Sequence, residues 1–138
     1  MTPRNRASER DATRTPRTSP RIDPELRTSQ VIVRARAQDR CERCGTSTLT
    51  AGSQVHHRHP RKVGGARRNP WINLPGNLLN LCPGCHEWIE HHREDARDCG
   101  WLVPMGATIS RDAPMLHALH GWVYLTDDGG YTPTQPPT

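Results

Sequence analysis

The feature that most constrains this 138-residue chain is a pair of C-x-x-C sequences, Cys41–Cys44 and Cys82–Cys85. Each pair places two thiolates about one turn apart, and two such pairs complete the tetrahedral S₄ shell that suits zinc. Four cysteine ligands leave no open coordination position, so we expect a structural zinc rather than a catalytic one. Redox-active dithiols and a chance spacing are the competing interpretations. The fifth cysteine, Cys99, has no partner of this kind.

A structural metal would compensate for a composition that is poor in core-forming side chains. Only 33% of the residues are hydrophobic, phenylalanine is absent, and there are 13 prolines and 11 glycines. Typical globular domains are about 45–50% apolar. Zinc held by four cysteines can supply on the order of 10–16 kcal/mol at neutral pH. The 37 residues between the pairs are about twice the insert of a simple zinc ribbon, so the zinc would fix the base of a longer element.

Positive charge is concentrated in the middle of the chain. The formal net charge is +5, and residues 31–69 carry nine Arg or Lys against two acidic residues, whereas residues 70–138 carry three against eight. A basic region beside an acidic one is typical of a surface that faces a polyanion, most commonly nucleic acid. The alternative is a solvated loop. We expect phosphate contacts from the basic residues of one segment: Arg58, Arg61, Lys62, Arg67 and Arg68.

The composition divides the chain into three parts. Residues 1–28, rich in Arg, Thr, Ser and Pro, indicate a disordered basic arm. Residues 29–126 are expected to form one domain, and residues 127–138 a turn with a flexible, proline-rich tail. No apolar run approaches the ~18 residues of a membrane span, and no secretory signal is visible. These features favour a cytoplasmic protein without a membrane partner.

Short helices and strands are expected to alternate within the central part. Helices are predicted at 29–40, with Ser29 as N-cap, and at 86–98, closed by Gly100. Extended segments are predicted in a hairpin through Leu49 and Val55, at 101–103, and at 122–125 before a turn at 127–130. This mixture predicts an α+β domain. Four histidines fit no role and are expected at the surface: His59, His92, His117 and His120.

Three segments in combination resemble one known family. They are Cys41-x-x-Cys44-Gly45, then Val55-His56-His57-Arg58 with Gly64-Gly65, then Asn77-Leu-Leu-x-Leu81-Cys82-x-x-Cys85-His86. The combination resembles the HNH endonuclease superfamily. More narrowly, it is similar to the small HNH proteins of actinobacteria and their tailed phages, whose helices often end in a segment like Gly100–Val103. The resemblance covers roughly residues 29–126 and implies a ββα-metal core with a four-cysteine zinc knuckle, flanked by a helix and strands.

The resemblance assigns a base and a loop-holding residue. His57 would be the general base that deprotonates the attacking water, and Asn77 would hold the ββα-metal loop in shape. Adjacent residues on a strand point to opposite faces, so His56 and His57 should have different roles. A histidine with a pKa near neutrality suits the role of base.

The resemblance also implies a catalytic divalent metal, Mg²⁺ or Mn²⁺. Its ligands would be His56 and His86, the latter nine residues after Asn77. A third ligand would be Glu90, His91 or water; Glu90 lies on the same helical face as His86. A metal held by few protein ligands leaves room for water and phosphate oxygens and acts as a Lewis acid.

The implied function is hydrolysis of DNA phosphodiester bonds to a 5′-phosphate and a 3′-hydroxyl. By analogy with the phage relatives, a terminase large subunit would be a partner in genome packaging, in the cytoplasm of a bacterium or of a phage-infected host. One alternative is a zinc-ribbon DNA-binding module without catalysis. Another is a redox or metal-storage protein.

Overall fold

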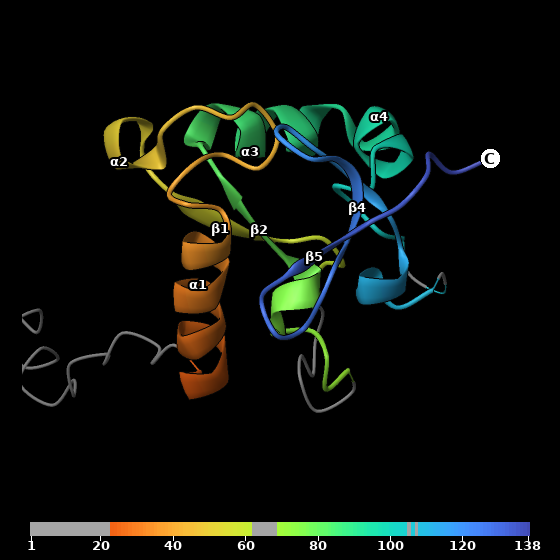
Figure 1. Ribbon diagram of the computed structural model, residues 1–138, viewed down its shortest axis with the longest axis horizontal. Coiled ribbons are helices and arrows are strands. Elements are labelled where there is room, and N and C mark those ends of the chain that lie inside the picture. Colours follow the sequence, from red (N-terminus) through yellow and green to blue (C-terminus); the bar gives the residue numbers. More distant parts are fainter. Residues whose placement is uncertain (1–22, 62–68, 105, 107) are drawn as a thin grey trace, which may run out of the picture.

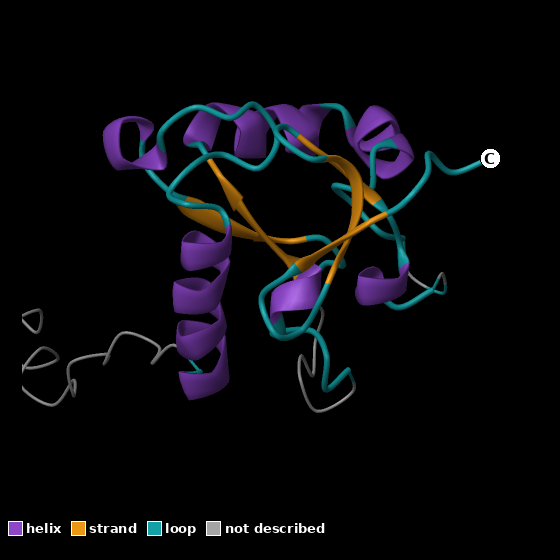
Figure 2. Cartoon of the chain, in the orientation of Figure 1, coloured by secondary structure: helices purple, strands orange, loops and turns teal. Residues whose placement is uncertain are grey.

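A computed structural model describes residues 23–61, 69–104, 106 and 108–138. Most of the predicted basic arm, together with Gly64, Gly65, Lys62, Arg67 and Arg68, lies outside the described residues. The helical elements are α1 (Pro24–Arg36), α2 (Thr48–Ala51), η2 (Pro75–Asn77), α3 (Pro83–His91), α4 (Arg93–Asp98) and η3 (Ser110–Asp112). The strands are β1 (Gln54–His57), β2 (Leu78–Leu81), β3 (Met115–His117), β4 (Gly121–Leu125) and β5 (Tyr131–Pro133). Figure 2 shows this mixture, which confirms the predicted α+β class.

Helix α1 begins at Pro24, and the prediction that it begins at Ser29 is wrong. The Asp23 carboxylate accepts hydrogen bonds from the backbone N–H groups of Glu25 (2.8 Å) and Leu26 (3.4 Å). Pro24 has no backbone N–H, but this costs nothing in the first turn, where N–H groups have no acceptor within the helix. Ser29 instead lies inside the helix and is buried. Residues 24–28 therefore belong to the folded domain and not to the arm.

Strands β1 and β2 pair antiparallel, with His56 opposite Leu79, and α3 follows β2 directly. Figure 1 shows α3 running across this pair of strands. The buried side chains of Leu79, Leu81 and Ile89 form part of the core between strands and helix. The predicted hairpin is wrong in one strand, because Leu49 lies in the single turn of α2 and β1 pairs with β2 instead.

A second antiparallel sheet has the order β3–β4–β5. The predicted strand 122–125 lies within β4, whereas residues 101–103 form a buried segment outside the strands. Strand β5 comes from the segment predicted to be a flexible tail, and it pairs with β4 from Tyr131 opposite Leu125. The prediction of a flexible tail is therefore wrong at residues 131–133, because these residues pair with β4 as the edge strand of the sheet.

The predicted helix 86–98 is broken at His92 into α3 and α4. His92 has φ −132° and ψ 54°, and its ring stacks on Trp88 with centroids 4.2 Å apart. The predicted end is confirmed: Gly100 follows α4 with φ +75°, and a Cβ there would lie 2.0 Å from the Pro114 carbonyl oxygen. None of the described helices has the length and apolar character that crossing a membrane requires.

Two of the histidines expected at the surface are buried. His59 and His117 are each 4% exposed. The Nε2 of His117 lies 2.9 Å from the Tyr131 hydroxyl and 3.3 Å from the Glu42 carboxylate. His117 thus joins β3 to β5 and to the turn between the first two cysteines.

Candidate active site

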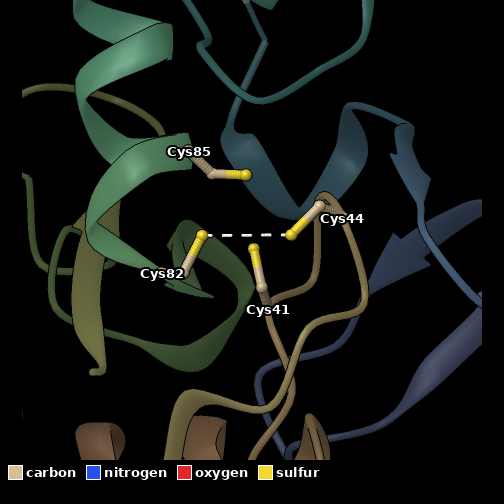
Figure 3. Close-up of side chains that lie close together, drawn as sticks. All are labelled: Cys41, Cys44, Cys82 and Cys85. Atoms are coloured by element: carbon tan, nitrogen blue, oxygen red, sulfur yellow. Dashed lines mark hydrogen bonds between the residues drawn. The ribbon is translucent and has the colours of Figure 1, made fainter. Parts of the chain in front are cut away.

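The four cysteines of the two C-x-x-C pairs converge on one point (Figure 3), and their sulfur atoms all lie within 4.8 Å of one another. Cys41 and Cys44 come from the turn after α1. Cys82 occupies the N-cap position of α3, and Cys85 lies in the first turn of this helix. The Sγ atoms of Cys44 and Cys82 are 3.9 Å apart. A tetrahedral site with Zn–S bonds of about 2.3 Å requires about 3.8 Å between sulfurs. The cluster is therefore compatible with structural zinc.

Arg43 lies beside this cluster. Its Nη1 donates a 3.2 Å hydrogen bond to Cys85 Sγ, and its guanidinium stacks 3.9 Å from the Trp88 ring centroid. Burial raises the pKa of the Cys85 thiol, so a metal or a nearby cation is needed to hold a thiolate there. Cys99, as expected, is not among the clustered cysteines.

A second cluster brings together potential ligand atoms of His56, His86 and Glu90, again within 4.8 Å of one another. His56 comes from β1, whereas His86 and Glu90 lie one turn apart on α3 and share a helical face. The structure thus unites the two histidines expected to bind the catalytic metal. It also favours Glu90 over His91, whose side chain is 71% exposed and lies 3.9 Å from Glu87.

Hydrogen bonds determine which imidazole nitrogens are available in this cluster. His56 Nε2 lies 2.8 Å from the Trp101 carbonyl oxygen, an acceptor, so Nε2 carries the proton and Nδ1 keeps its lone pair. His86 Nδ1 lies 2.6 Å from Gln54 Oε1, which leaves Nε2 free by the same logic. Burial, together with nearby positively charged side chains, lowers the pKa of His56 to about 4, although the hydrogen bond to the Trp101 carbonyl oxygen opposes this shift. The lowered pKa keeps the His56 ring neutral, and the two hydrogen bonds orient both rings as metal ligands require.

A pocket of about 290 Å³ opens over this cluster. Both His56 and His57 line it, although they turn to different partners: His56 to the Trp101 carbonyl and His57 to Asn73, with Nε2···Oδ1 2.9 Å. Burial lowers the pKa of His57, which keeps its ring neutral at neutral pH. Arg93 also lines the pocket and donates a 3.1 Å hydrogen bond to Glu90.

The Asn77 side chain is buried and uses all of its bonding capacity on nearby chain segments. Its Oδ1 accepts from the His59 backbone N–H (2.8 Å) and from the Ser110 hydroxyl. Its Nδ2 donates to the carbonyl oxygens of Ile72 (2.8 Å) and His59 (3.3 Å). This amide ties the segment after β1 to the segment before η2, a geometry that suits the expected loop-holding role.

Arg58 is not a phosphate contact, contrary to the prediction. The residue is 0% exposed, and its guanidinium donates to four backbone carbonyls, those of Gly76, Gly100, Ser110 and Ala113. Burial lowers the pKa of Arg58 to about 9, which still leaves it charged at neutral pH. Arg58 thus fastens the end of β1 to the segments around it. Of the other predicted contacts, Arg61 is exposed, and the rest lie outside the described residues.

Sequence reasoning missed two residues of this site. Arg93 lies beyond the end of α3, as the first residue of α4, and still pairs with Glu90 three positions earlier. Asn73 lies in an irregular segment and reaches His57 only through the fold. In the sequence, the spacing of three residues between Glu90 and Arg93 could have indicated their contact, because side chains three apart meet on a helix.

Comparison with known families agrees with the geometry. Residues 41–93 match the family model described as HNH endonuclease. The matched segment spans both cysteine pairs, both strands of the ββα unit and helix α3. Over this segment the chain is similar to the HNH endonuclease family. Comparison with curated proteins and with solved structures gives no match.

Proposed function

We propose that this protein is an endonuclease that hydrolyses DNA phosphodiester bonds with a divalent metal and His57 as general base. One observation carries the proposal: the ligand atoms of His56, His86 and Glu90 converge in the pocket that His57 also lines. The match of residues 41–93 to the HNH endonuclease family supports the same chemistry.

His56, His86 and Glu90 would hold one divalent cation, Mg²⁺ or Mn²⁺, through two imidazole nitrogens and one carboxylate oxygen. Three protein ligands leave coordination positions for water and phosphate oxygens. When bound, such a cation supplies Lewis-acid stabilisation of the charge that develops on the phosphate and on the leaving 3′-oxygen.

His57 would accept the proton of the attacking water. Its Nε2 is engaged with Asn73, so the lone pair of Nδ1 is free. The lowered pKa of His57 keeps this nitrogen unprotonated at neutral pH, as a base requires. Because the ring is only half-buried, the proton can then pass to solvent.

Arg93 would contact the phosphate in place of the buried Arg58. Its side chain is 42% exposed, lines the pocket and already carries one charge-assisted hydrogen bond, to Glu90. A guanidinium can bind two phosphate oxygens at once. Arg93 therefore offers both positioning and neutralisation of charge beside the three potential metal ligands.

The four-cysteine cluster would bind a structural zinc that holds the start of α3. Cys85 immediately precedes His86, so fixing the first also fixes the second. A cytoplasmic location and a phage terminase large subunit as partner, as expected from the sequence and the resemblance, complete the proposal.

The test is cleavage of supercoiled plasmid by the full chain purified with zinc. We expect relaxed circles with Mg²⁺ or Mn²⁺ and none with excess chelator added just before the reaction. DNA ligase should reseal the nicks if the ends are a 5′-phosphate and a 3′-hydroxyl. Zinc content, measured in parallel, excludes loss of the fold as the reason for inhibition. If no divalent cation supports cleavage while the chain still binds DNA, the protein is a non-catalytic zinc-ribbon module.

A further inference from the structure

Within the described residues, the ring of His57 makes one side-chain hydrogen bond, to Asn73. The two meet through His57 Nε2 and Asn73 Oδ1, 2.9 Å apart, across 16 positions of sequence. Asn73 is 0% exposed and lies in the segment before η2. The contact therefore joins the end of β1 to the irregular segment before η2.

This contact decides which nitrogen of His57 can act. An amide oxygen only accepts hydrogen bonds, so Nε2 must carry the ring proton and Nδ1 must be the bare nitrogen. The reversed amide would place its N–H₂ group against Nε2 and would demand the opposite tautomer. The orientation of the Asn73 amide thus determines the tautomer of His57.

The fold makes little other use of the Asn73 side chain. Within the described residues, its Nδ2 is buried without a hydrogen-bond partner, and its one side-chain bond goes to His57. Burying an amide that leaves a donor unsatisfied is unfavourable. An apolar side chain in this place would leave no donor unsatisfied, so packing alone does not explain an asparagine here.

Asn77 stabilises the backbone next to Asn73. Its Nδ2 donates a 2.8 Å hydrogen bond to the carbonyl oxygen of Ile72, the residue before Asn73. Asn77 therefore holds the backbone from which Asn73 reaches His57. The buried amide of Asn77 therefore contacts both segments that meet at this hydrogen bond, through Ile72 on one side and His59 on the other.

We propose that Asn73 is a positioning residue that fixes the ring plane and the Nε2–H tautomer of His57, so that Nδ1 faces the attacking water. The inference rests on the proposed function of His57 as general base. Asn73 does not touch the substrate in this scheme. Its effect is exerted entirely through the imidazole.

Two nearly isosteric substitutions test the role. Asn73→Leu removes the acceptor and also removes the unsatisfied donor, so the fold should survive; Asn73→Asp keeps an oxygen at the same position. We expect Asn73→Leu to lower kcat roughly 10–100-fold, as for other outer partners of active-site histidines, with unchanged KM for DNA and an unchanged Mg²⁺ requirement. Asn73→Asp should recover most of the lost kcat once the pH is high enough to keep the ring neutral beside the new carboxylate.

A spectroscopic measurement separates this inference from the proposed function. Imidazole ¹⁵N chemical shifts of His57, assigned by their absence in His57→Gln, report the tautomer of the neutral ring with or without catalysis. The wild type should show Nε2–H alone, and Asn73→Leu should show a mixture or a reversal. An Nδ1–H ring in the wild type, or an unchanged kcat in Asn73→Leu, would overturn the role of Asn73. A wild type that never cleaves overturns the proposed function, while the tautomer comparison still decides whether Asn73 controls the ring.

Discussion

Arg36 Nη2 and Glu42 Oε1 form an ion pair 2.7 Å long, with side chains 1% and 0% exposed. The pair joins the last turn of α1 to the turn between Cys41 and Cys44. Glu42 also accepts from the Asn80 backbone N–H (2.9 Å) and the Tyr131 hydroxyl (2.7 Å). Burial favours the neutral acid, but the charge of Arg36 and the hydrogen bonds from His117, Arg36 and the Asn80 N–H outweigh it and lower the pKa of Glu42 to about 2.

Glu42→Gln should therefore destabilise the protein at neutral pH, by on the order of 3–5 kcal/mol, because Arg36 is left buried without its anion. The folded-state pKa is depressed from 4.5 to about 2. Stability from this carboxylate is thus fully present above pH 4.5 and is lost as the pH falls toward 2.

Denaturant unfolding of the wild type and of Glu42→Gln at several pH values measures this difference directly. The difference in free energy of unfolding between the two proteins should become smaller below pH 4.5. Both proteins release zinc in acid, so this effect largely cancels from the difference. Glu94→Gln, at an exposed position on α4, should show almost no gap at any pH. A gap that stays constant from pH 7 to 3 would mean that Glu42 does not titrate as described.

Cys82→Ser should give a chain without zinc that is largely unfolded or insoluble, because the small hydrophobic core cannot replace the metal. Cys99→Ser is the matched control, since Cys99 lies outside the cluster, and it should keep both zinc and fold. Zinc content and circular dichroism measure the outcome. A Cys82→Ser protein of native stability without bound zinc would refute a structural role for the metal.

Glu90→Gln should raise the Mg²⁺ concentration needed for half-maximal cleavage by at least roughly tenfold. The neighbouring His91→Ala should leave it unchanged, because His91 points away to solvent beside Glu87. Titration of the cleavage rate with Mg²⁺ compares the two variants. The opposite ranking would assign the third ligand to His91 and would require α3 to be distorted.

Arg93→Ala should lower kcat/KM for DNA about 10–100-fold, the usual worth of a charge-assisted hydrogen bond. It should also reduce the salt slope of DNA binding by about one. Arg97→Ala removes an exposed arginine from α4 that does not line the pocket, and it should have little effect. Equal effects of both substitutions would show that Arg93 acts only as general surface charge.

The local parts of the site were predictable from sequence because they depend on short spacing. Each C-x-x-C pair fixes two sulfurs within one turn, and the four-residue step from His86 to Glu90 places both side chains on one helical face. The wrong predictions depend on contacts between distant segments. Arg58 is buried by carbonyl groups up to 55 positions away, and no local pattern marks such an environment.

Element boundaries failed for a related reason. Both Asp23 and Ser29 are residue types that cap helices, and the choice of Asp23 follows from Pro24 and from the burial of Ser29. The helix break at His92 accompanies the stacking of its ring on Trp88, and β5 forms by pairing with the edge of β4. Pro24 and the Trp88–His92 contact are local features, whereas the burial of Ser29 and the pairing of β5 depend on tertiary packing.

The decisive measurement is plasmid nicking by His57→Ala beside His56→Ala across a series of Mg²⁺ and Mn²⁺ concentrations. His57 is assigned to proton transfer alone, so its loss should lower the rate ~10²–10⁴-fold at every metal concentration while zinc content and DNA affinity stay nearly intact. His56→Ala should lose activity through weaker metal binding and should recover in part as the metal concentration rises. Cleavage by His57→Ala at the wild-type rate would contradict the assignment of His57 as the base.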